Sequence, residues 1–353
     1  MSIESPEKQK MNTKNLIIGG KTIGQGHPTF VIAEIGINHN GMVSVAKKLI
    51  DSAKKAGADA VKFQKRTVPI VFGEQELAQA RPVHREVLKS AIDRGVLSAD
   101  AVSRLKSSDF EKSTNGDLKY ALEFTQDEYR EIADYCNQIG IIWFASPWDE
   151  ESVDFLDDLG TPAYKIASAS ITDDNLLKHI RSKERPIIMS TGGANLDMIK
   201  YAVSVIGKND LALLHCTSFY VKPVDGSERM CEMVNLKAIG TLKKEFPELP
   251  IGFSSHFSGI MPALYSVVLG ADIVEAHITL ERSMWGSDQA SSLEPHEFSE
   301  LVRKIREYEV LRGDGEVVIY PEEVPVMKKL RRKTSDGQTE LFLKHLANHV
   351  RHK

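Results

Sequence analysis

"LGADIVEAH" at residues 269–277 repeats, late in the chain, the pattern of "AGADAVKFQ" at residues 56–64. In both stretches a helical pattern closes at a glycine, an aspartate follows two residues later, and an apolar strand then begins that carries polar side chains. "LGTPAYKIAS" at residues 159–168 is a looser third copy. Helix and strand that alternate in this way predict a parallel sheet with right-handed crossovers.

Short apolar segments extend this pattern along the chain. Helical patterns separate most of them, and the one at 125–140 has a capping box and a closing glycine. Eight such units predict an α/β fold, the closed (β/α)8 TIM barrel. The rival is an open doubly wound sheet, which favours a GxGxxG turn after the first strand, and "GINHNG" at 36–41 does not match it. The predicted strands are 29–36, 59–64, 141–147, 163–168, 186–191, 211–217, 251–256 and 272–279.

Two further segments complete the predicted barrel domain, residues 15–335. "NLIIGGKTIG" at 15–24 has a Gly-Gly turn and predicts a β-hairpin that closes the bottom of the barrel. Residues 66–122, after the second strand, are too many for a simple loop and predict an insertion with its own helical stretch at 84–106. We expect a flexible N-terminus at 1–14 and a C-terminal tail at 336–353.

Composition places the chain among globular proteins. Of its 353 residues, 42% are hydrophobic and 27% are charged, and the net charge of −4 favours no polyanionic partner. We interpret the basic run "KKLRRK" at 328–333 as solvated rather than as a nucleic-acid site. Three distant cysteines and a polar N-terminus predict a reducing, cytoplasmic location. No apolar run reaches the roughly 18 residues that a membrane span needs.

Polar residues lie at or just past the C-terminal end of the predicted strands. In a barrel these ends meet at one mouth, where active sites form. Because a buried polar group is costly without a partner, so many of them predict a catalytic or ligand-binding mouth. They are Glu34, Lys62, Gln64, Ser146, Lys165, Ser168, Ser190, Thr191, His215, Ser254, His256, Glu275 and His277.

Two histidines end neighbouring strands of this predicted barrel. His256 and His277, with substrate oxygens and water, suit a first-row divalent metal such as Mn²⁺. Glu275 shares the strand face of His277 and is either a ligand or a partner of one. The alternative is a pair of ordinary polar histidines, and His215 is a weaker candidate for either role.

Two lysines stand in strands that point at the same mouth. Lys62 and Lys165 are each consistent with a Schiff-base amine or with an anchor for an anionic substrate. The many hydroxyls around them favour the anchor, since hydroxyls add hydrogen bonds to phosphate or carboxylate oxygens. The residues alone therefore predict a metal-assisted barrel enzyme that acts on a phosphorylated or carboxylated small molecule.

Six motifs stand out along the chain: "AEIGINHNG" (33–41), "AVKFQ" (60–64), "AYKIAS" (163–168), "LLHCTSFY" (213–220), "GFSSH" (252–256) and "HITLERSMWGSDQASSLEP" (277–295). Together they resemble the N-acetylneuraminate (sialic acid) synthase family, over its catalytic barrel. The resemblance implies a TIM-barrel transferase of the EC 2.5.1 type, which condenses phosphoenolpyruvate with an aldose such as N-acetylmannosamine. The products would be a 2-keto-3-deoxy sugar acid such as N-acetylneuraminate and phosphate. It also implies a divalent metal, Mn²⁺ before Mg²⁺ or Co²⁺, and a homodimer.

The resemblance also assigns roles to residues. The metal histidines fall on His256 and His277, and Glu34 and Glu275 are the candidates for proton transfer. The sugar would contact Glu34 and the residues Gln64, Tyr220 and Asp288. Phosphoenolpyruvate would be held by Lys62, Ser146, Lys165, Ser168, Ser190, Ser218 and Ser254.

The chain departs from the family pattern in several places. Ser218 stands where some relatives have asparagine, Ser170 where some have glutamate, and Ala276 where many have arginine. Many relatives carry a C-terminal antifreeze-like domain whose arginine enters the partner's sugar site. We expect that arginine to be absent here, and Arg81 or Arg85 of the insertion to replace it unless the pocket stays more open.

Other functions remain open at this point. The acid formed is N-acetylneuraminate or a relative such as legionaminate, pseudaminate or deaminated sialic acid. A metal-dependent sugar isomerase or lyase on the same barrel would not consume phosphoenolpyruvate. A non-catalytic sugar-acid-binding relative would bind ligand without turnover.

Overall fold

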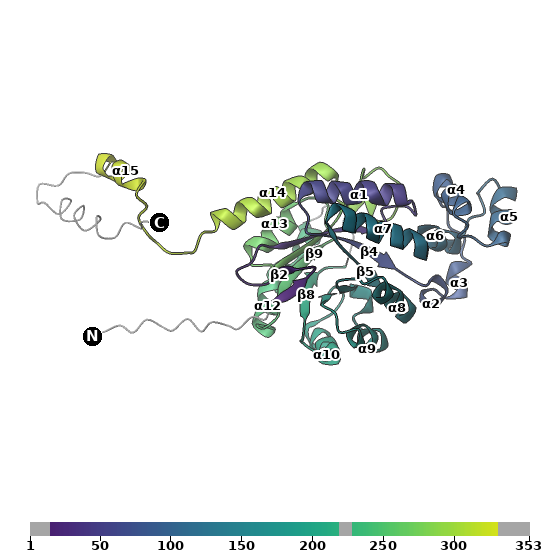
Figure 1. Cartoon of the computed structure of the whole chain (residues 1–353), viewed down its shortest axis with the longest axis horizontal. Helices are drawn as coiled ribbons and strands as arrows, with labels where there is room; N and C mark the ends of the chain where they lie inside the picture. The colour runs from purple at the N-terminus through teal and green to yellow at the C-terminus, as the bar shows by residue number, and fades with distance from the viewer. Residues whose placement is uncertain (1–14, 219–227, 331–353) are drawn as a thin grey trace, which may run out of the picture. The chain divides into compact units, whose positions relative to one another are not determined.

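The computed structural model describes residues 15–218 and 228–330 (Figure 1). Its centre is a closed barrel of eight parallel strands, in which β10 pairs with β3 to close the ring. Each strand is followed by helical structure, so the predicted TIM barrel is confirmed. The strands are β3 (Phe30–Gly36), β4 (Ala60–Lys65), β5 (Ile142–Pro147), β6 (Tyr164–Ile166), β7 (Ile187–Ser190), β8 (Leu211–Cys216), β9 (Ile251–Ser255) and β10 (Ile273–His277).

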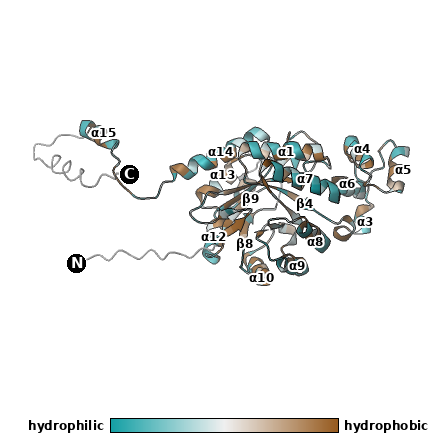
Figure 2. Ribbon diagram, viewed as in Figure 1, coloured by the Kyte–Doolittle hydropathy of each residue, from teal (hydrophilic) through white to brown (hydrophobic). Residues whose placement is uncertain are grey.

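Amphipathic helices surround the barrel, and Figure 2 shows both apolar and polar residues on them. Helix α7 begins at the predicted capping box of Thr125 and Glu128 and ends at Gly140, whose φ of 70° suits glycine. The helices outside the insertion are α1 (Val43–Ala56), α7 (Gln126–Ile139), α8 (Glu150–Asp158), α9 (Asp174–Ser182), α10 (Leu196–Ile206), α11 (Glu228–Met233), α12 (Ala238–Glu245), α13 (Met261–Val268) and α14 (Pro295–Leu311), with 3₁₀ turns η1 (Ser168–Ser170) and η3 (Gln289–Ser291).

The predicted N-terminal hairpin is present and belongs to the core. Strands β1 (Leu16–Ile18) and β2 (Lys21–Ile23) pair antiparallel. Leu16, Ile18 and Ile23 are buried, in one cluster with residues near the N-terminal ends of the barrel strands, such as Phe30 and Ile273. The hairpin therefore closes the end of the barrel opposite to the mouth.

The segment between β4 and α7 is a helical insertion, as predicted. It contains α2 (Val68–Val71), α3 (Glu74–Leu77), α4 (Arg85–Asp93), α5 (Ala99–Ser107) and α6 (Asn115–Leu122), which gather at one side of the barrel in Figure 1. Buried side chains such as Val87, Leu88 and Leu105 give it a small core of its own. The helical stretch expected at 84–106 is two helices, because Gly95 has a φ of 68° and Ser98 caps a new helix.

The turn after β3 packs directly against this insertion. Gly41 has a φ of 71°, and a Cβ at this position would lie 2.0 Å from the carbonyl oxygen of Ala121. Arg94, the residue directly after α4, donates to that carbonyl at 2.8 Å and to Glu128 Oε1 at 2.6 Å. The insertion is thus held to the barrel by a contact that a side chain at position 41 would prevent.

His39 in the same turn should make the stability of the protein depend on pH. Its ring is buried and stacks on Phe124, and burial, followed by the charge of Arg94, lowers its pKa from 6.5 to about 3. The unfolded chain takes up a proton below pH 6.5 that the folded protein does not, so stability is lost as the pH falls from 6.5 towards 3. We expect the free energy of unfolding to fall by roughly 2 kcal/mol more between pH 7 and pH 5 than in His39→Gln. Urea denaturation at both pH values checks this, and parallel losses in the two proteins would contradict it.

The chain divides into two compact units, residues 1–306 and 307–353. The barrel, the hairpin and the insertion belong to the first, and α15 (Glu323–Leu330) belongs to the second. Within the described ranges, none of the helices has the length and apolar character needed to cross a membrane. The segments 1–14 and 336–353 and the last three residues of "KKLRRK" lie outside the described residues, and the domain limits 15–335 stay a prediction.

Candidate functional site

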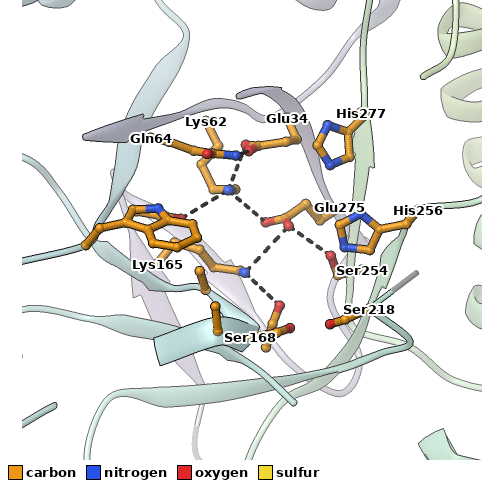
Figure 3. Close-up of a pocket in the computed structure, with 15 residues that line it drawn as sticks. Glu34, Lys62, Gln64, Lys165, Ser168, Ser218, Ser254, His256, Glu275 and His277 are labelled. Carbon is orange, nitrogen blue, oxygen red and sulfur yellow. Dashed lines mark hydrogen bonds and ion pairs between the residues drawn. The ribbon is translucent and has the colours of Figure 1, made fainter. Parts of the chain in front are cut away.

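A cavity of about 260 Å³ lies at the C-terminal ends of the barrel strands (Figure 3). Strand alternation brings these side chains to one place, because residues two apart in a strand share a face. The cavity collects both predicted metal histidines and every residue predicted for phosphoenolpyruvate, together with Gln64 and both candidate acids. Its lining is Glu34, Lys62, Gln64, Ser146, Trp148, Lys165, Ala167, Ser168, Ala169, Ser190, Ser218, Ser254, His256, Glu275 and His277.

Two ammonium groups and two carboxylates meet in the floor of this cavity. Lys62 Nζ lies 2.7 Å from Glu34 Oε2 and 4.0 Å from Glu275 Oε2. Lys165 Nζ lies 3.5 Å from Glu275 Oε1 on the other side. All four side chains are at most 5% exposed. The carboxylates therefore balance the lysines where water is largely excluded.

The pKa values follow from this arrangement. Burial alone would lower the pKa of Lys62, but the carboxylates of Glu275 and Glu34 raise it above its usual value. Burial dominates at Lys165, whose pKa is lowered despite Glu275. Burial would raise the pKa of Glu275, yet Lys165 and Lys62 bring it down to about 2. Glu275 is consequently ionised at neutral pH. A further anion in the cavity would stabilise the charged form of Lys165 more than that of Lys62, whose charge the carboxylates already stabilise.

Hydroxyl groups surround the lysines. Lys62 Nζ donates to Ser146 Oγ at 3.2 Å, and Lys165 Nζ donates to Ser190 Oγ at 2.6 Å. The hydroxyl of Ser254 donates to Glu275 Oε1 at 2.9 Å. Ammonium groups and hydroxyls close together can bind carboxylate or phosphate oxygens.

A glycine allows two more hydroxyls to approach the lysine cluster. The backbone N–H of Gly192 donates to Ser168 Oγ at 3.1 Å. A Cβ at residue 192 would lie 2.7 Å from that oxygen and 2.1 Å from Ser218 Oγ. Position 192 must therefore lack a side chain for both serines to line the cavity. Ser170 is buried in η1 and does not line it.

The two histidines stand side by side at the edge of the cavity, as Figure 3 shows. The ring centroids of His256 and His277 are 5.1 Å apart. Burial, followed by the neighbouring His277, lowers the pKa of His256 to about 3, so its ring is neutral, which is the form that binds metals. Two imidazoles fit a first-row divalent ion whose other positions are filled by water or substrate oxygens. In the described parts of the chain, no group of three or more His, Cys, Asp or Glu side chains gathers to hold a metal.

Some predicted residues lie elsewhere. Asp288 is buried just before η3 and does not line this cavity. His215 forms a 2.9 Å hydrogen bond with the carbonyl oxygen of Val234, also outside the cavity. Arg85 forms an exposed ion pair with Asp109. Arg81 lines a second cavity, and Tyr220 lies outside the described residues.

Sequence reasoning missed two side chains at the mouth. Trp148 lines the cavity directly after β5, and the guanidinium of Arg66 lies 4.4 Å from the centroid of its ring. Arg66 also donates to Gln64 Oε1, and Gln64 Nε2 donates to Glu34 Oε1 at 3.0 Å. Arg66 is thereby connected to the candidate acid Glu34. Trp148 and Arg66 each stand one position after the end of a strand, and this position is the only feature of the sequence that indicates their place at the mouth.

Comparison with known proteins identifies relatives that are similar to this chain over most of its length. Human N-acetylneuraminate-9-phosphate synthase is 35% identical over 314 residues, which cover 88% of this chain and 79% of the human protein. N,N'-diacetyllegionaminic acid synthase of Legionella pneumophila is 35% identical over 329 residues, or 91% of this chain and 84% of that protein.

A solved structure of a related synthase is also similar to this chain. The N-acetylneuraminic acid (sialic acid) synthetase of Leptospira borgpetersenii, in complex with citrate, matches with a TM-score of 0.67 and 30% identity, over 91% of this chain and 99% of that chain. The sequence profile described as the NeuB family matches residues 49–317. The similar proteins are sugar-acid synthases, and the chain belongs to the NeuB family.

Proposed function

We propose that the protein is a transferase that condenses phosphoenolpyruvate with an aldose of the N-acetylmannosamine type. The products are a 2-keto-3-deoxy sugar acid and phosphate. The observation that carries this proposal is the cavity in which two buried lysines, several hydroxyls, two carboxylates and two histidines converge. The names of the relatives, synthases of N-acetylneuraminate 9-phosphate and of diacetyllegionaminic acid, support the class of product.

The lysines and hydroxyls anchor phosphoenolpyruvate. Its carboxylate and phosphate carry charges that Lys62 and Lys165 match, and Lys165 is the cation with the lowered pKa. Ser146 and Ser190, already hydrogen-bonded to these two lysines, donate to the same oxygens. The substrate thereby takes over partners that Glu275 holds in the free protein.

His256 and His277 would hold the divalent metal, for which we propose Mn²⁺. When bound, the metal supplies Lewis-acid polarisation of the aldehyde oxygen. The low pKa of His256 keeps its ring available as a ligand at neutral pH.

The bond changes balance without an oxidant or reductant. Carbon 3 of phosphoenolpyruvate forms a bond to the aldehyde carbon, and the aldehyde oxygen takes up a proton. A water oxygen adds to carbon 2 and gives up one proton, which leaves a hydroxyl there. The bond between carbon 2 and the bridging oxygen then breaks, and the proton of that hydroxyl passes to the departing phosphate. Carbon 2 is left as the ketone of the product.

Glu34 and Glu275 are the groups placed to move these protons. Glu275 is ionised because two lysines surround it, and its pKa rises once the substrate anion claims those lysines. It can then accept a proton from the attacking water. Glu34 is held in place by its ion pair with Lys62 and its hydrogen bond from Gln64, and it lies on the side of Lys62 opposite to Glu275. A base must reach its proton within hydrogen-bond distance, and both carboxylates line the cavity in which the substrate would bind.

Consumption of phosphoenolpyruvate tests the proposal directly. The full chain is incubated with phosphoenolpyruvate, Mn²⁺ and one of several aldoses: N-acetylmannosamine, its 6-phosphate or mannose. We expect aldose-dependent loss of phosphoenolpyruvate and release of phosphate, both absent after chelation of the metal. If the protein consumes no phosphoenolpyruvate with all three of these aldoses, the proposal is overturned.

Replacement of both histidines tests the metal site separately. We expect the double variant His256→Ala/His277→Ala to lose Mn²⁺ binding, measured by the decrease of the free-ion signal in electron paramagnetic resonance, because both imidazole donors are gone. His179→Ala, which removes a surface histidine paired with Asp154, should bind Mn²⁺ like the wild type. Mn²⁺ binding that survives in the double variant would refute the assignment.

A further inference from the structure

A chain of polar contacts runs from the insertion to the wall of the first cavity. Glu123, the residue directly after α6, accepts from the backbone N–H of Arg66 at 3.2 Å and from its Nη1 at 3.3 Å. Arg66 Nη2 donates to Gln64 Oε1, and Gln64 Nε2 donates to Glu34 Oε1 at 3.0 Å. Figure 3 shows the last part of this chain, from Gln64 through Glu34 to Lys62. The insertion is thereby connected to a candidate acid of the proposed reaction.

Arg66 determines which way the amide of Gln64 faces. A guanidinium has only donors, so the amide atom that it contacts must be the oxygen. The amide nitrogen then faces Glu34, whose carboxylate is paired with Lys62 and accepts the hydrogen bond. The reverse orientation would place the amide oxygen against the carboxylate and the amide N–H groups against the guanidinium, so both hydrogen bonds would be lost.

Neighbouring groups leave this amide little room to turn. A Cβ at residue 36 would lie 3.0 Å from Glu34 Oε1 and 3.2 Å from Gln64 Nε2, so the bare backbone of Gly36 packs against their hydrogen bond. The guanidinium of Arg66 lies 4.4 Å from the ring centroid of Trp148, and the Arg66 side chain is only 12% exposed. The position of the guanidinium is therefore set by the folded chain.

Glu123 holds Arg66 from the side of the insertion. Its carbonyl oxygen accepts from Arg94 Nη2 at 2.6 Å, and its carboxyl lies between Arg66 and Lys65, whose Nζ is 3.7 Å from Oε2. Burial raises the pKa of Glu123, and the charges of Arg66 and Lys65 counteract this rise. The main chain and the side chain of Glu123 are thus both held by cationic side chains.

We propose that Arg66 is a positioning residue of the reaction: it fixes the amide of Gln64 and, through that amide, the carboxylate of Glu34. The inference rests on the proposed condensation and adds to it a residue that does not line the cavity. Lys62, Lys165 and the serines around them anchor phosphoenolpyruvate without Arg66. Loss of Arg66 should therefore slow turnover and leave the binding of phosphoenolpyruvate nearly unchanged.

Single variants test this role by steady-state kinetics. In Arg66→Met we expect kcat to fall about tenfold or more, while the KM for phosphoenolpyruvate changes by less than about twofold, because a misplaced proton-transfer group affects the reaction itself. Arg66→Lys keeps a donor and a positive charge and should recover part of the loss. A raised KM with an unchanged kcat would overturn the inference, since Arg66 would then act by binding the substrate.

Arg104→Met is the matched control. Arg104 is another arginine of the insertion and lies 2.9 Å from the buried carboxylate of Asp117. Its loss should lower stability as the loss of Arg66 does, but it should leave kcat within about twofold of the wild type because it has no contact with Gln64. An equal fall of kcat in Arg104→Met and Arg66→Met would overturn the inference in favour of a general weakening of the insertion.

A double-mutant cycle shows whether Arg66 acts through Gln64. Gln64→Leu alone should lower kcat, and Arg66→Met should have almost no further effect in that background, because no amide remains to be oriented. Effects of the two substitutions that multiply would overturn the inference, since Arg66 would then act independently of Gln64.

Thermal unfolding of the same four proteins needs no turnover. We expect the fall in Tm of the double variant to be smaller than the sum of the falls in the two single variants, since each substitution removes the same hydrogen bond. Additive losses would overturn the inference whether or not the protein is active. A wild-type protein that consumes no phosphoenolpyruvate would instead overturn the proposed function, and the unfolding cycle would still decide whether Arg66 fixes Gln64.

Discussion

Lys62→Met is expected to abolish turnover of phosphoenolpyruvate and to lower the free energy of unfolding by about 3–5 kcal/mol, because it leaves buried carboxylates without their cation. Lys62 lies between Glu34 and Glu275, and all three side chains are at most 5% exposed. Lys165 remains as the single ammonium group for two carboxylates. Urea denaturation and an assay of phosphoenolpyruvate consumption measure the two effects.

A double variant separates charge balance from catalysis. Glu34→Gln/Lys62→Met restores one carboxylate for one ammonium group, so it should recover most of the lost stability and remain inactive. Lys47→Met, which breaks an exposed pair with Glu131, should cost less than about 1 kcal/mol. If the double variant is no more stable than Lys62→Met, buried charge imbalance is not the cause of the loss.

Gly252→Ala is expected to destabilise the barrel by about 3 kcal/mol or more, since the added methyl group cannot be accommodated. Gly252 lies in β9, between β8 and β10. A Cβ there would lie 2.5 Å from the carbonyl oxygen of Ile273 and 2.5 Å from Leu214 Cδ2. A side chain can rotate away, but the backbone of β10 is fixed by its pairing on both sides.

Gly240→Ala is the matched control for this prediction. Gly240 lies in α12, and a Cβ at this position would meet no atom within 4 Å, so alanine there should stabilise the protein by roughly 0.5–1 kcal/mol. Thermal and urea denaturation of both variants measure the difference. A Gly252→Ala protein as stable as the wild type would show that β9 and β10 can separate locally, contrary to the structure.

Local patterns in the sequence predict most of the barrel. The strands are short and mostly apolar, and several of them, such as β4 and β5, follow a helix that ends at a glycine. Their positions can therefore be read from neighbouring residues. The division of 84–106 into two helices was missed because the periodicity of apolar residues continues across Gly95. The packing of the turn at Gly41 against Ala121 also could not be predicted, since the two residues are 80 positions apart and meet only in the folded chain.

The first cavity was predictable for a specific reason. In a parallel barrel, the position of a residue along its strand largely determines whether it reaches the mouth, so Lys62, Lys165 and Glu275 could be placed together. Residues carried by loops obey no such rule. Asp288 was assigned to the sugar but lies outside the first cavity, and Arg66 and Trp148 were missed although they flank it. The roles of these residues in binding and turnover remain proposals.

The ion pairs of Lys62 and Lys165 with their carboxylates have a consequence for when desolvation takes place. Both ammonium groups lose their water as the chain folds, so that part of the free-energy cost appears as reduced stability of the protein. An arriving anion then meets cations that are already dry and fixed in position. For the anionic substrate that we propose, the site is preorganised: its internal carboxylates pair with the lysines until the substrate takes their place, and little rearrangement of solvent is left for the binding step.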